Sequence, residues 1–65
     1  MEVMNRHITP LPRKQRVALE LKMRDRRLSE VATAEMLGIS RMTLRRVIAG
    51  APVTPRTFQT VSQWL

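Results

Sequence analysis

The sequence AEMLGISRMTLRRVIAG, residues 34–50, decides the fold. Gly38 supplies the left-handed backbone that a helix end often requires, and it ends a helix for which Ser29 is a suitable N-cap. Ser40 follows only two residues later and can cap a second helix over 41–49. The stretch therefore predicts two short helices that meet across a tight turn.

The residues on either side of this pair predict one further helix each. Pro12 suits the first turn of a helix, and the segment after it is rich in helix-favouring residues. Gly50 ends the second helix of the pair, and Thr54 followed by Pro55 is a typical N-cap and first residue of a further helix. No segment reads as part of a sheet, so the expected fold is a compact all-α, four-helix domain. The expected elements are an extended N-terminal arm or short strand over 1–11 and helices over about 12–27, 30–37, 41–49 and 55–64.

The apolar residues of the two outer helices predict which faces are buried. In the first helix, Leu19 and Met23 fall off the main apolar face, so we expect them to be exposed or to receive the N-terminal arm or a second subunit. The residues that recur at steps of three and four, and so form the expected core face, are Val17, Ala18, Leu21 and Leu28. The expected stripe of the last helix is Phe58, Val61 and Leu65, with Trp64 beside it.

The charge of the chain is strongly one-sided. Its 65 residues contain 12 Lys and Arg against five Asp and Glu, a formal net charge of +7, and no acidic residue follows Glu35. Such a field attracts polyanions. The apolar runs are far shorter than the roughly 20 residues of a membrane-spanning helix, and the first ten residues lack the apolar stretch of a secretory signal. The sequence therefore favours nucleic acid over a membrane, and a cytoplasmic location on the nucleoid of a bacterial cell.

The residue types needed for catalysis or metal binding are scarce. The chain has no cysteine, no tyrosine and a single histidine, so thiolate metal sites are excluded and His7 alone cannot form a zinc site. The sequence shows neither a carboxylate pair near that histidine nor a glycine-rich phosphate loop. We therefore expect a protein that is not an enzyme and that binds no metal, no cofactor and no small-molecule ligand.

The central stretch resembles the helix-turn-helix of the Cro and phage-repressor family, whose members have the lambda-repressor-like fold. The positions that carry the resemblance are Ala34, Leu37, Gly38, Ile39, Leu44 and Val47. Outside the motif, Arg24 precedes Ser29 by the family's spacing, and a proline-started apolar helix follows Gly50. One departure is Thr33, where the family usually has a larger apolar side chain, which predicts loose packing beneath the second helix. The resemblance implies a helix-turn-helix DNA-binding domain over 12–65.

The resemblance places the helix over 41–49 in the major groove of double-stranded DNA. Leu44, Val47 and Ile48 share one side of this helix and should be buried. The opposite side carries the residues expected to read bases, which are Arg41, Met42, Arg45 and Arg46. No acidic residue nearby in sequence can pair with these arginines, so we expect them to need an outside partner. The residues expected to bind phosphates are Ser40, Thr43, Arg24, Arg26, Arg56 and Thr57.

These observations predict a sequence-specific DNA-binding regulator of transcription, a Cro-like repressor of a phage, prophage or plasmid. Dimers of such proteins place two reading helices about 34 Å apart, so the expected partner is a two-fold symmetric operator, bound by a homodimer that forms at least on DNA. Three alternatives stay open. One is an excisionase-like recombination directionality factor, although that family usually has a basic β-wing where this chain has its last helix. The others are a small protein-interaction module such as an antitoxin, and a non-specific architectural DNA-binding protein.

Overall fold

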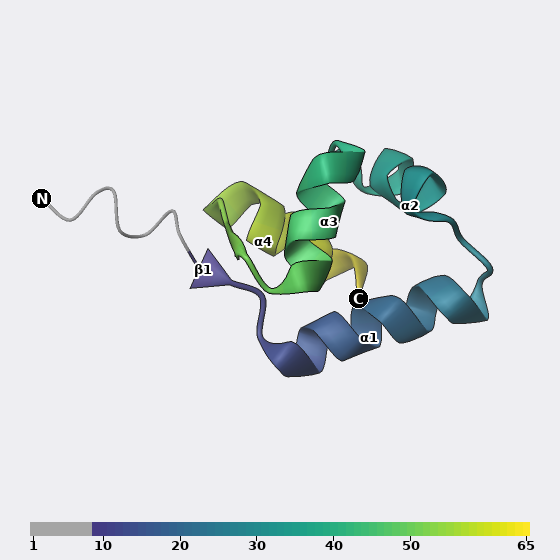
Figure 1. The fold of residues 1–65 in the computed structure, drawn as a ribbon, viewed down its shortest axis with the longest axis horizontal. Coiled ribbons are helices and arrows are strands. Elements are labelled where there is room, and N and C mark those ends of the chain that lie inside the picture. Colours follow the sequence, from purple (N-terminus) through teal and green to yellow (C-terminus); the bar gives the residue numbers. More distant parts are fainter. Residues whose placement is uncertain (1–8) are drawn as a thin grey trace, which may run out of the picture.

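The computed structural model describes residues 9–65, and four helices joined by short turns make up most of it (Figure 1). The helices are α1 (Arg13–Asp25), α2 (Glu30–Leu37), α3 (Arg41–Ala49) and α4 (Pro55–Trp64), and the strands are β1 (Thr9–Pro10) and β2 (Pro52–Val53). The expected all-α, four-helix fold is thus confirmed. The last three helices have their predicted bounds, whereas α1 begins one residue later and ends two residues earlier than predicted. None of the helices within residues 9–65 has both the length and the apolar character that spanning a membrane requires.

Polar N-caps begin three of the helices, as the sequence predicts. The side chains of Ser29, Ser40 and Thr54 each accept a hydrogen bond from the backbone N–H three residues further on, at 3.0, 3.0 and 3.3 Å. Such a cap satisfies one of the backbone donors that the first turn leaves unpaired, and it contributes about 1 kcal/mol. Pro55 lies in the first turn of α4, where its missing N–H costs nothing.

Left-handed backbone ends the first three helices. Gly38 (φ 72°) and Gly50 (φ 84°) end α2 and α3, as predicted. After α1 the same conformation falls on Arg27 (φ 54°), and the N–H of Leu28 donates to the carbonyl oxygen of Met23 at 2.8 Å. A residue other than glycine costs about 1–2 kcal/mol in this conformation. Because no glycine marks this turn, its position was not predictable from residue types.

Gly50→Ala is expected to destabilise the fold more than Gly38→Ala. Both substitutions place a side chain on left-handed backbone, at a cost of about 1–2 kcal/mol. A Cβ at position 38 would meet nothing within 4 Å, whereas one at position 50 would lie 2.7 Å from Nη1 of Arg16. The Nε of Arg16 donates to the carbonyl oxygen of Leu11 at 3.1 Å, and displacing this side chain weakens a bond worth about 1 kcal/mol. Urea denaturation measures both losses, and equal losses would contradict the role given to Arg16.

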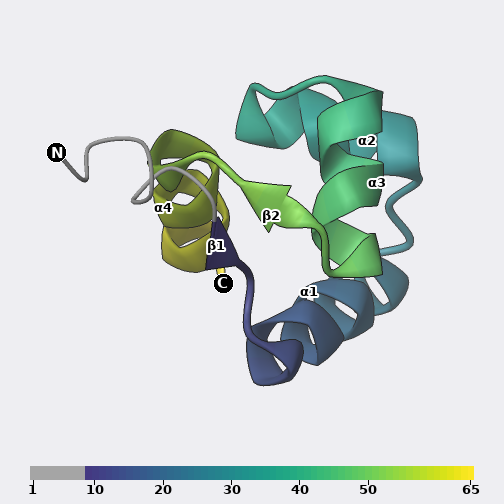
Figure 2. The same cartoon turned by 60° about the vertical axis from the view of Figure 1, so that its left-hand side comes forward.

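A two-stranded sheet joins the N-terminal segment to the connection between α3 and α4, and the sequence did not predict it. β1 and β2 run antiparallel, with Thr9 opposite Val53 and Pro10 opposite Pro52 (Figure 2). Two residues are too few to show the alternation that marks a strand, and proline lacks the N–H that a ladder uses. Of the arm or short strand expected over 1–11, Thr9 and Pro10 form β1, and residues 1–8 lie outside the described residues.

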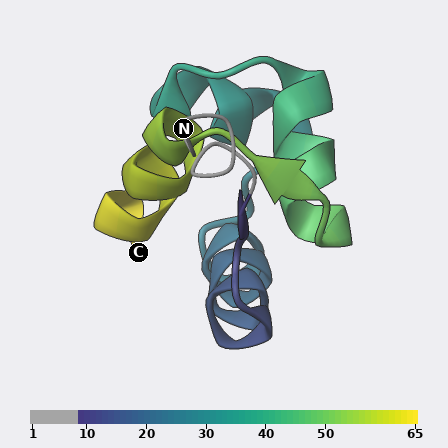
Figure 3. The same ribbon diagram turned by 90° about the vertical axis from the view of Figure 1, so that its left-hand side faces the viewer.

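The hydrophobic core lies where the helices face one another, with α1 on one side and α3 and α4 on the other (Figure 3). Its buried apolar side chains are Leu11, Leu19, Ala34, Leu37, Leu44, Val47, Val53 and Val61. Leu11 precedes α1 and Val53 belongs to β2, so the connecting segments also contribute to the core. Full burial of a valine or leucine side chain stabilises the fold by about 1.5–3 kcal/mol.

The face of α1 that packs against the core is opposite to the predicted face. Leu19 is fully buried and Met23 packs against the core, whereas Val17 and Leu21 are 45% and 46% exposed. Ala18, the third residue of the predicted face within α1, is exposed as well. The prediction is therefore wrong for this helix, and Leu19 is not available to a second subunit.

Long polar side chains share the buried side of α1, which explains the error. Oε1 of Gln15 accepts a hydrogen bond from Oγ of Ser62 at 3.1 Å. Nζ of Lys22 donates to the backbone carbonyl of Trp64 and lies 4.3 Å from the centre of its ring. Such side chains cover apolar surface with their stems while their polar ends find partners. The core face of α1 therefore combines Leu19 with polar residues, so the spacing of apolar residues in the sequence does not reveal it.

α4 keeps its predicted face, with one correction at its end. Val61 is fully buried, and Phe58 and Trp64 pack against the core. Leu65 lies beyond the last turn of α4 and is 37% exposed, so it does not extend the buried stripe as predicted. In α2, Thr33 is fully buried and its Oγ1 donates to the backbone carbonyl four residues earlier at 2.8 Å. Its hydroxyl group is therefore satisfied inside the core.

Candidate nucleic-acid interface

α3 has one buried side and one cationic side. Leu44 and Val47 are fully buried, and Ile48 packs against the core. The residues on the opposite side are all exposed, and they are Arg41, Met42, Arg45 and Arg46. Met42, at 71%, is the most exposed large apolar residue among the described ones. The structure thus places all four residues that were expected to read bases on the outward side of α3.

Hydrogen bonds at both ends hold α3 in place. The turn before it is closed by the N–H of Ile39, which donates to the carbonyl oxygen of Ala34 in α2 at 3.0 Å. After it, the N–H of Ala51 donates to the carbonyl oxygen of Arg46 at 3.0 Å, and the chain continues into β2. α1 and α2 both contact α3 (Figure 1). The cationic side is therefore carried by a helix that its neighbours fix in position.

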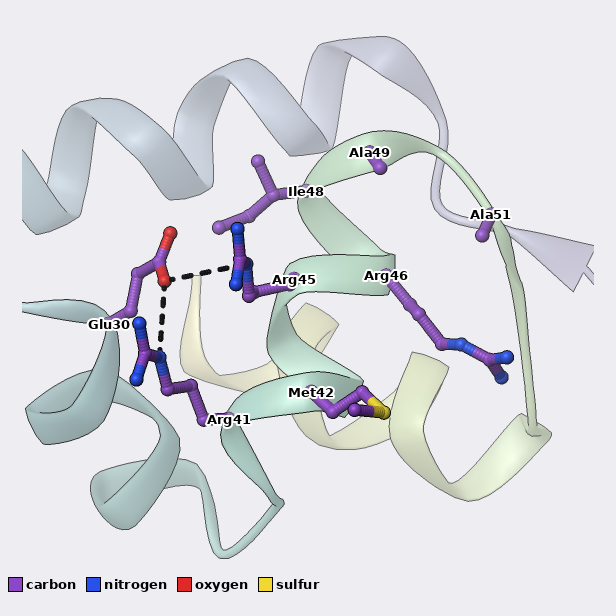
Figure 4. A pocket seen from close by; sticks show the side chains of 8 residues that line it. All are labelled: Glu30, Arg41, Met42, Arg45, Arg46, Ile48, Ala49 and Ala51. Carbon is purple, nitrogen blue, oxygen red and sulfur yellow. Dashed lines mark ion pairs between the residues drawn. The ribbon is translucent and has the colours of Figure 1, made fainter.

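The cationic side of α3 lines an open hollow in the molecular surface (Figure 4). The lining residues are Glu30, Arg41, Met42, Arg45, Arg46, Ile48, Ala49 and Ala51. Three of these eight are arginines and one is acidic. Small-molecule sites usually enclose most of their ligand, whereas this hollow is wide open to solvent. Its shape and charge suit the surface of a large anion.

Glu30, the first residue of α2, forms ion pairs with two of the arginines in α3. Its Oε1 lies 3.6 Å from Nε of Arg41 and 3.8 Å from Nε of Arg45. The expectation that these two arginines need an outside partner is therefore wrong, because the packing of α2 against α3 brings the start of α2 beside α3. The three side chains are between 40% and 64% exposed. Exposed pairs of this kind contribute about 0.2–1 kcal/mol each.

Met42 and Arg46 form a second stripe, next to that of Arg41 and Arg45 on the surface of α3. Both side chains point away from Glu30 (Figure 4). Among the ion pairs within residues 9–65, none includes Arg46. Arg46 is therefore the arginine of α3 that is best placed to meet an anion from outside.

A second hollow brings together the starts of α3 and α4. Its lining residues are Leu37, Gly38, Ile39, Ser40, Thr43, Arg56, Thr57 and Thr60. Oγ of Ser40 donates to Oγ1 of Thr43 at 2.9 Å, and Oγ1 of Thr54 donates to Oγ1 of Thr57 at 3.2 Å. Helix starts carry partial positive charge and unpaired N–H groups, which favour anions. The hollow contains four of the six residues that were expected to bind phosphates.

The other two residues of that set, Arg24 and Arg26, line neither hollow. Both are exposed, Arg24 in the last turn of α1 and Arg26 just after it. Basic side chains at this position favourably meet the negative end of the helix dipole. The structure therefore explains their presence without a ligand and leaves them apart from the two hollows.

Sequence reasoning missed Glu30 and Thr60 as parts of this surface. Glu30 lies far from Arg41 in sequence, but two helices that cross after a tight turn bring the start of the first beside the second. The helix-turn-helix pattern therefore held the signal for this contact. Thr60 follows Thr57 by three residues in α4, so its place beside Thr57 follows from helical spacing.

Comparisons with protein-family models, with curated protein sequences and with solved structures found no match.

Proposed function

We propose that this protein is a sequence-specific regulator of transcription that binds double-stranded DNA and reads the major groove with α3. The observation that carries the proposal is the cationic side of α3, where three arginines lie exposed on a helix whose other side is anchored in the core. The major groove admits an α-helix and presents a different pattern of donors and acceptors for each base pair. The negative charge of DNA matches the arginines of the hollow, and the width of the major groove matches an open hollow built on a helix.

Each residue on the outward side of α3 has a role in this proposal. Arg46 donates two parallel hydrogen bonds to O6 and N7 of a guanine, a contact that discriminates between bases by about 1–3 kcal/mol. Met42, beside it, packs against the methyl group of a thymine. Arg41 and Arg45 reach further bases with the Nη ends of their guanidinium groups, because Glu30 lies nearest their Nε atoms.

The hollow between the starts of α3 and α4 is the proposed phosphate contact. Thr43 and Thr57 accept hydrogen bonds from Ser40 and Thr54, so each can donate its own hydroxyl proton to a phosphate, and Ser40 can do so by giving up its bond to Thr43. Arg56 offers a positive charge, and the first turns of both helices offer backbone N–H groups. Arg24 and Arg26, which line neither hollow, are proposed as separate phosphate contacts at the end of α1. If about six phosphates are neutralised, the logarithm of the affinity should fall against the logarithm of the salt concentration with a slope near −5.

The segment after α3 supports a Cro-like repressor over an excisionase-like factor. Excisionase-like proteins usually follow the reading helix with a basic β-wing, whereas Gly50 here leads to the two residues of β2 and then to α4. We therefore propose a repressor of a phage, prophage or plasmid that acts in the cytoplasm of a bacterial host. Its partner is a two-fold symmetric operator, to which it binds as a homodimer.

Selection from a pool of random duplexes tests this proposal. The expected result is enrichment of an inverted repeat whose half-sites lie about one helical turn apart, with guanine at positions within each half-site. Enrichment of a single site without a repeat would support sequence-specific binding but contradict the proposed homodimer. A pool that stays random after repeated rounds would contradict the proposal and leave non-specific binding by the net charge of +7.

A further inference from the structure

One carboxylate oxygen contacts two arginines on the outward side of α3. Oε1 of Glu30 lies 3.6 Å from Nε of Arg41 and 3.8 Å from Nε of Arg45, one helical turn apart (Figure 4). Glu30 is the single acidic residue among those that line the α3 hollow. The arginines of this surface are therefore not equivalent, because Arg41 and Arg45 are tethered by Glu30 and Arg46 is not.

The base of the Glu30 side chain is itself well fixed. Glu30 is the first residue of α2, next to the N-cap Ser29, whose side chain accepts from the N–H of Ala32 at 3.0 Å. The positive end of the α2 dipole favours a negative charge at this position. The carboxylate is therefore held beside α3 by the backbone of another helix.

The contact leaves the ends of both guanidinium groups available. The carboxylate oxygen lies near Nε in each case, whereas two parallel hydrogen bonds to a guanine can be donated by the Nη atoms. A fixed negative charge near Nε reduces the attraction of these arginines for any phosphate, which depends on charge alone. It does not remove the hydrogen bonds that distinguish one base from another.

We propose that Glu30 is a positioning residue that raises the sequence discrimination of α3, by orienting Arg41 and Arg45 and by lowering their attraction for DNA of any sequence. This inference rests on the proposed function. It gives the acidic residue in an otherwise cationic hollow a role that differs from that of the arginines. Glu30 favours the correct site by weakening binding to every other site.

The test compares Glu30→Gln with Glu35→Gln. Both glutamates belong to α2 and both substitutions raise the formal net charge from +7 to +8. Glu35 is exposed and does not line the α3 hollow, so it controls for net charge. Affinities for the selected duplex and for a random-sequence duplex are measured by fluorescence anisotropy over a range of salt concentrations. Thermal unfolding of each variant establishes that it is folded.

Glu30→Gln is expected to strengthen binding to the random-sequence duplex by up to about tenfold at 0.1 M salt and to steepen its salt slope by up to about 0.9, the effect of one added phosphate contact. Binding to the selected duplex should gain less, so the ratio of the two affinities falls. Glu35→Gln should leave this ratio unchanged. In a variant that also carries Arg41→Ala and Arg45→Ala, Glu30→Gln should no longer alter the ratio.

Two results overturn the inference, and they are distinguishable. If the wild-type protein prefers its selected duplex but Glu30→Gln leaves the affinity ratio as Glu35→Gln does, Glu30 has no positioning role and the proposed function stands. If the wild-type protein shows no preference for any duplex, the proposed function fails and the role of Glu30 fails with it.

Discussion

Leu19→Ala is expected to lower the free energy of unfolding by about 2–5 kcal/mol, the range for removing a leucine side chain from a packed core. Leu19 is fully buried on the inner side of α1. Leu21→Ala, two residues further along the same helix, removes a side chain that is 46% exposed. It should change the free energy of unfolding by less than about 1 kcal/mol. Urea denaturation of both variants measures the difference.

This pair of variants decides between the two possible faces of α1. The two substitutions are chemically identical and lie in one helix, so helix propensity affects both equally. The apolar pattern of the sequence alone ranks Leu21 above Leu19, and the structure ranks them in the reverse order. A larger loss for Leu21→Ala than for Leu19→Ala would show that α1 faces the core as the sequence pattern suggests, and would refute the packing described for α1.

Arg46→Ala is expected to weaken binding to the selected duplex by about 5- to 150-fold, the equivalent of the 1–3 kcal/mol that a bidentate contact to guanine provides. Arg46 is exposed on α3 and has no ion pair within the described residues, so its removal should leave the fold unchanged. Fluorescence anisotropy at one fixed salt concentration measures the loss.

Arg13→Ala is the matched control for this variant. It removes the same charge from an exposed residue, at the start of α1, that lines neither hollow. Its effect should be small and equal for the selected and the random-sequence duplex, because only net charge changes. Equal losses for Arg46→Ala and Arg13→Ala would mean that charge alone binds DNA and that α3 does not read bases.

The bounds of the helices could be predicted because local residues determine them. Ser40 caps α3 through the N–H of Thr43, and Gly38 and Gly50 take the left-handed backbone that ends their helices. Each of these signals acts over three or four residues. Arg27 shows the limit of this reasoning, since it adopts the same backbone as the two glycines without their residue type.

The packing of the elements against one another could be predicted only in part. The buried side of α3 follows from its own apolar spacing, and Leu44 and Val47 are buried as expected. The buried side of α1 depends on residues far away in sequence, because Ser62 and Trp64 of α4 provide partners for Gln15 and Lys22. The pairing of β1 with β2 is also a long-range contact, and strands of two residues are too short to be predicted from the sequence pattern.

In the candidate site, too, features that lie within one helix could be predicted, whereas contacts between helices could not be predicted as directly. The four outward residues of α3 could be named from the sequence because one helix carries them all. The contact of Glu30 with two of them was missed, because it joins the start of α2 to α3 and its only signal is the crossing of the two helices that the helix-turn-helix pattern implies. Four residues of the second hollow, Ser40, Thr43, Arg56 and Thr57, were named from the sequence, but that they line one hollow depends on the starts of α3 and α4 lying together.

Methylation interference on the selected duplex tests most directly whether α3 reads bases in the major groove. Dimethyl sulphate modifies guanine at N7, in the major groove, and adenine at N3, in the minor groove. We predict that N7 methylation of specific guanines blocks binding of the wild-type protein. For Arg46→Ala, the signal at the guanine that Arg46 contacts should disappear while the others remain. Interference confined to adenine N3, or a guanine pattern identical for the wild-type protein and for Arg41→Ala, Arg45→Ala and Arg46→Ala, would contradict the reading of bases by α3.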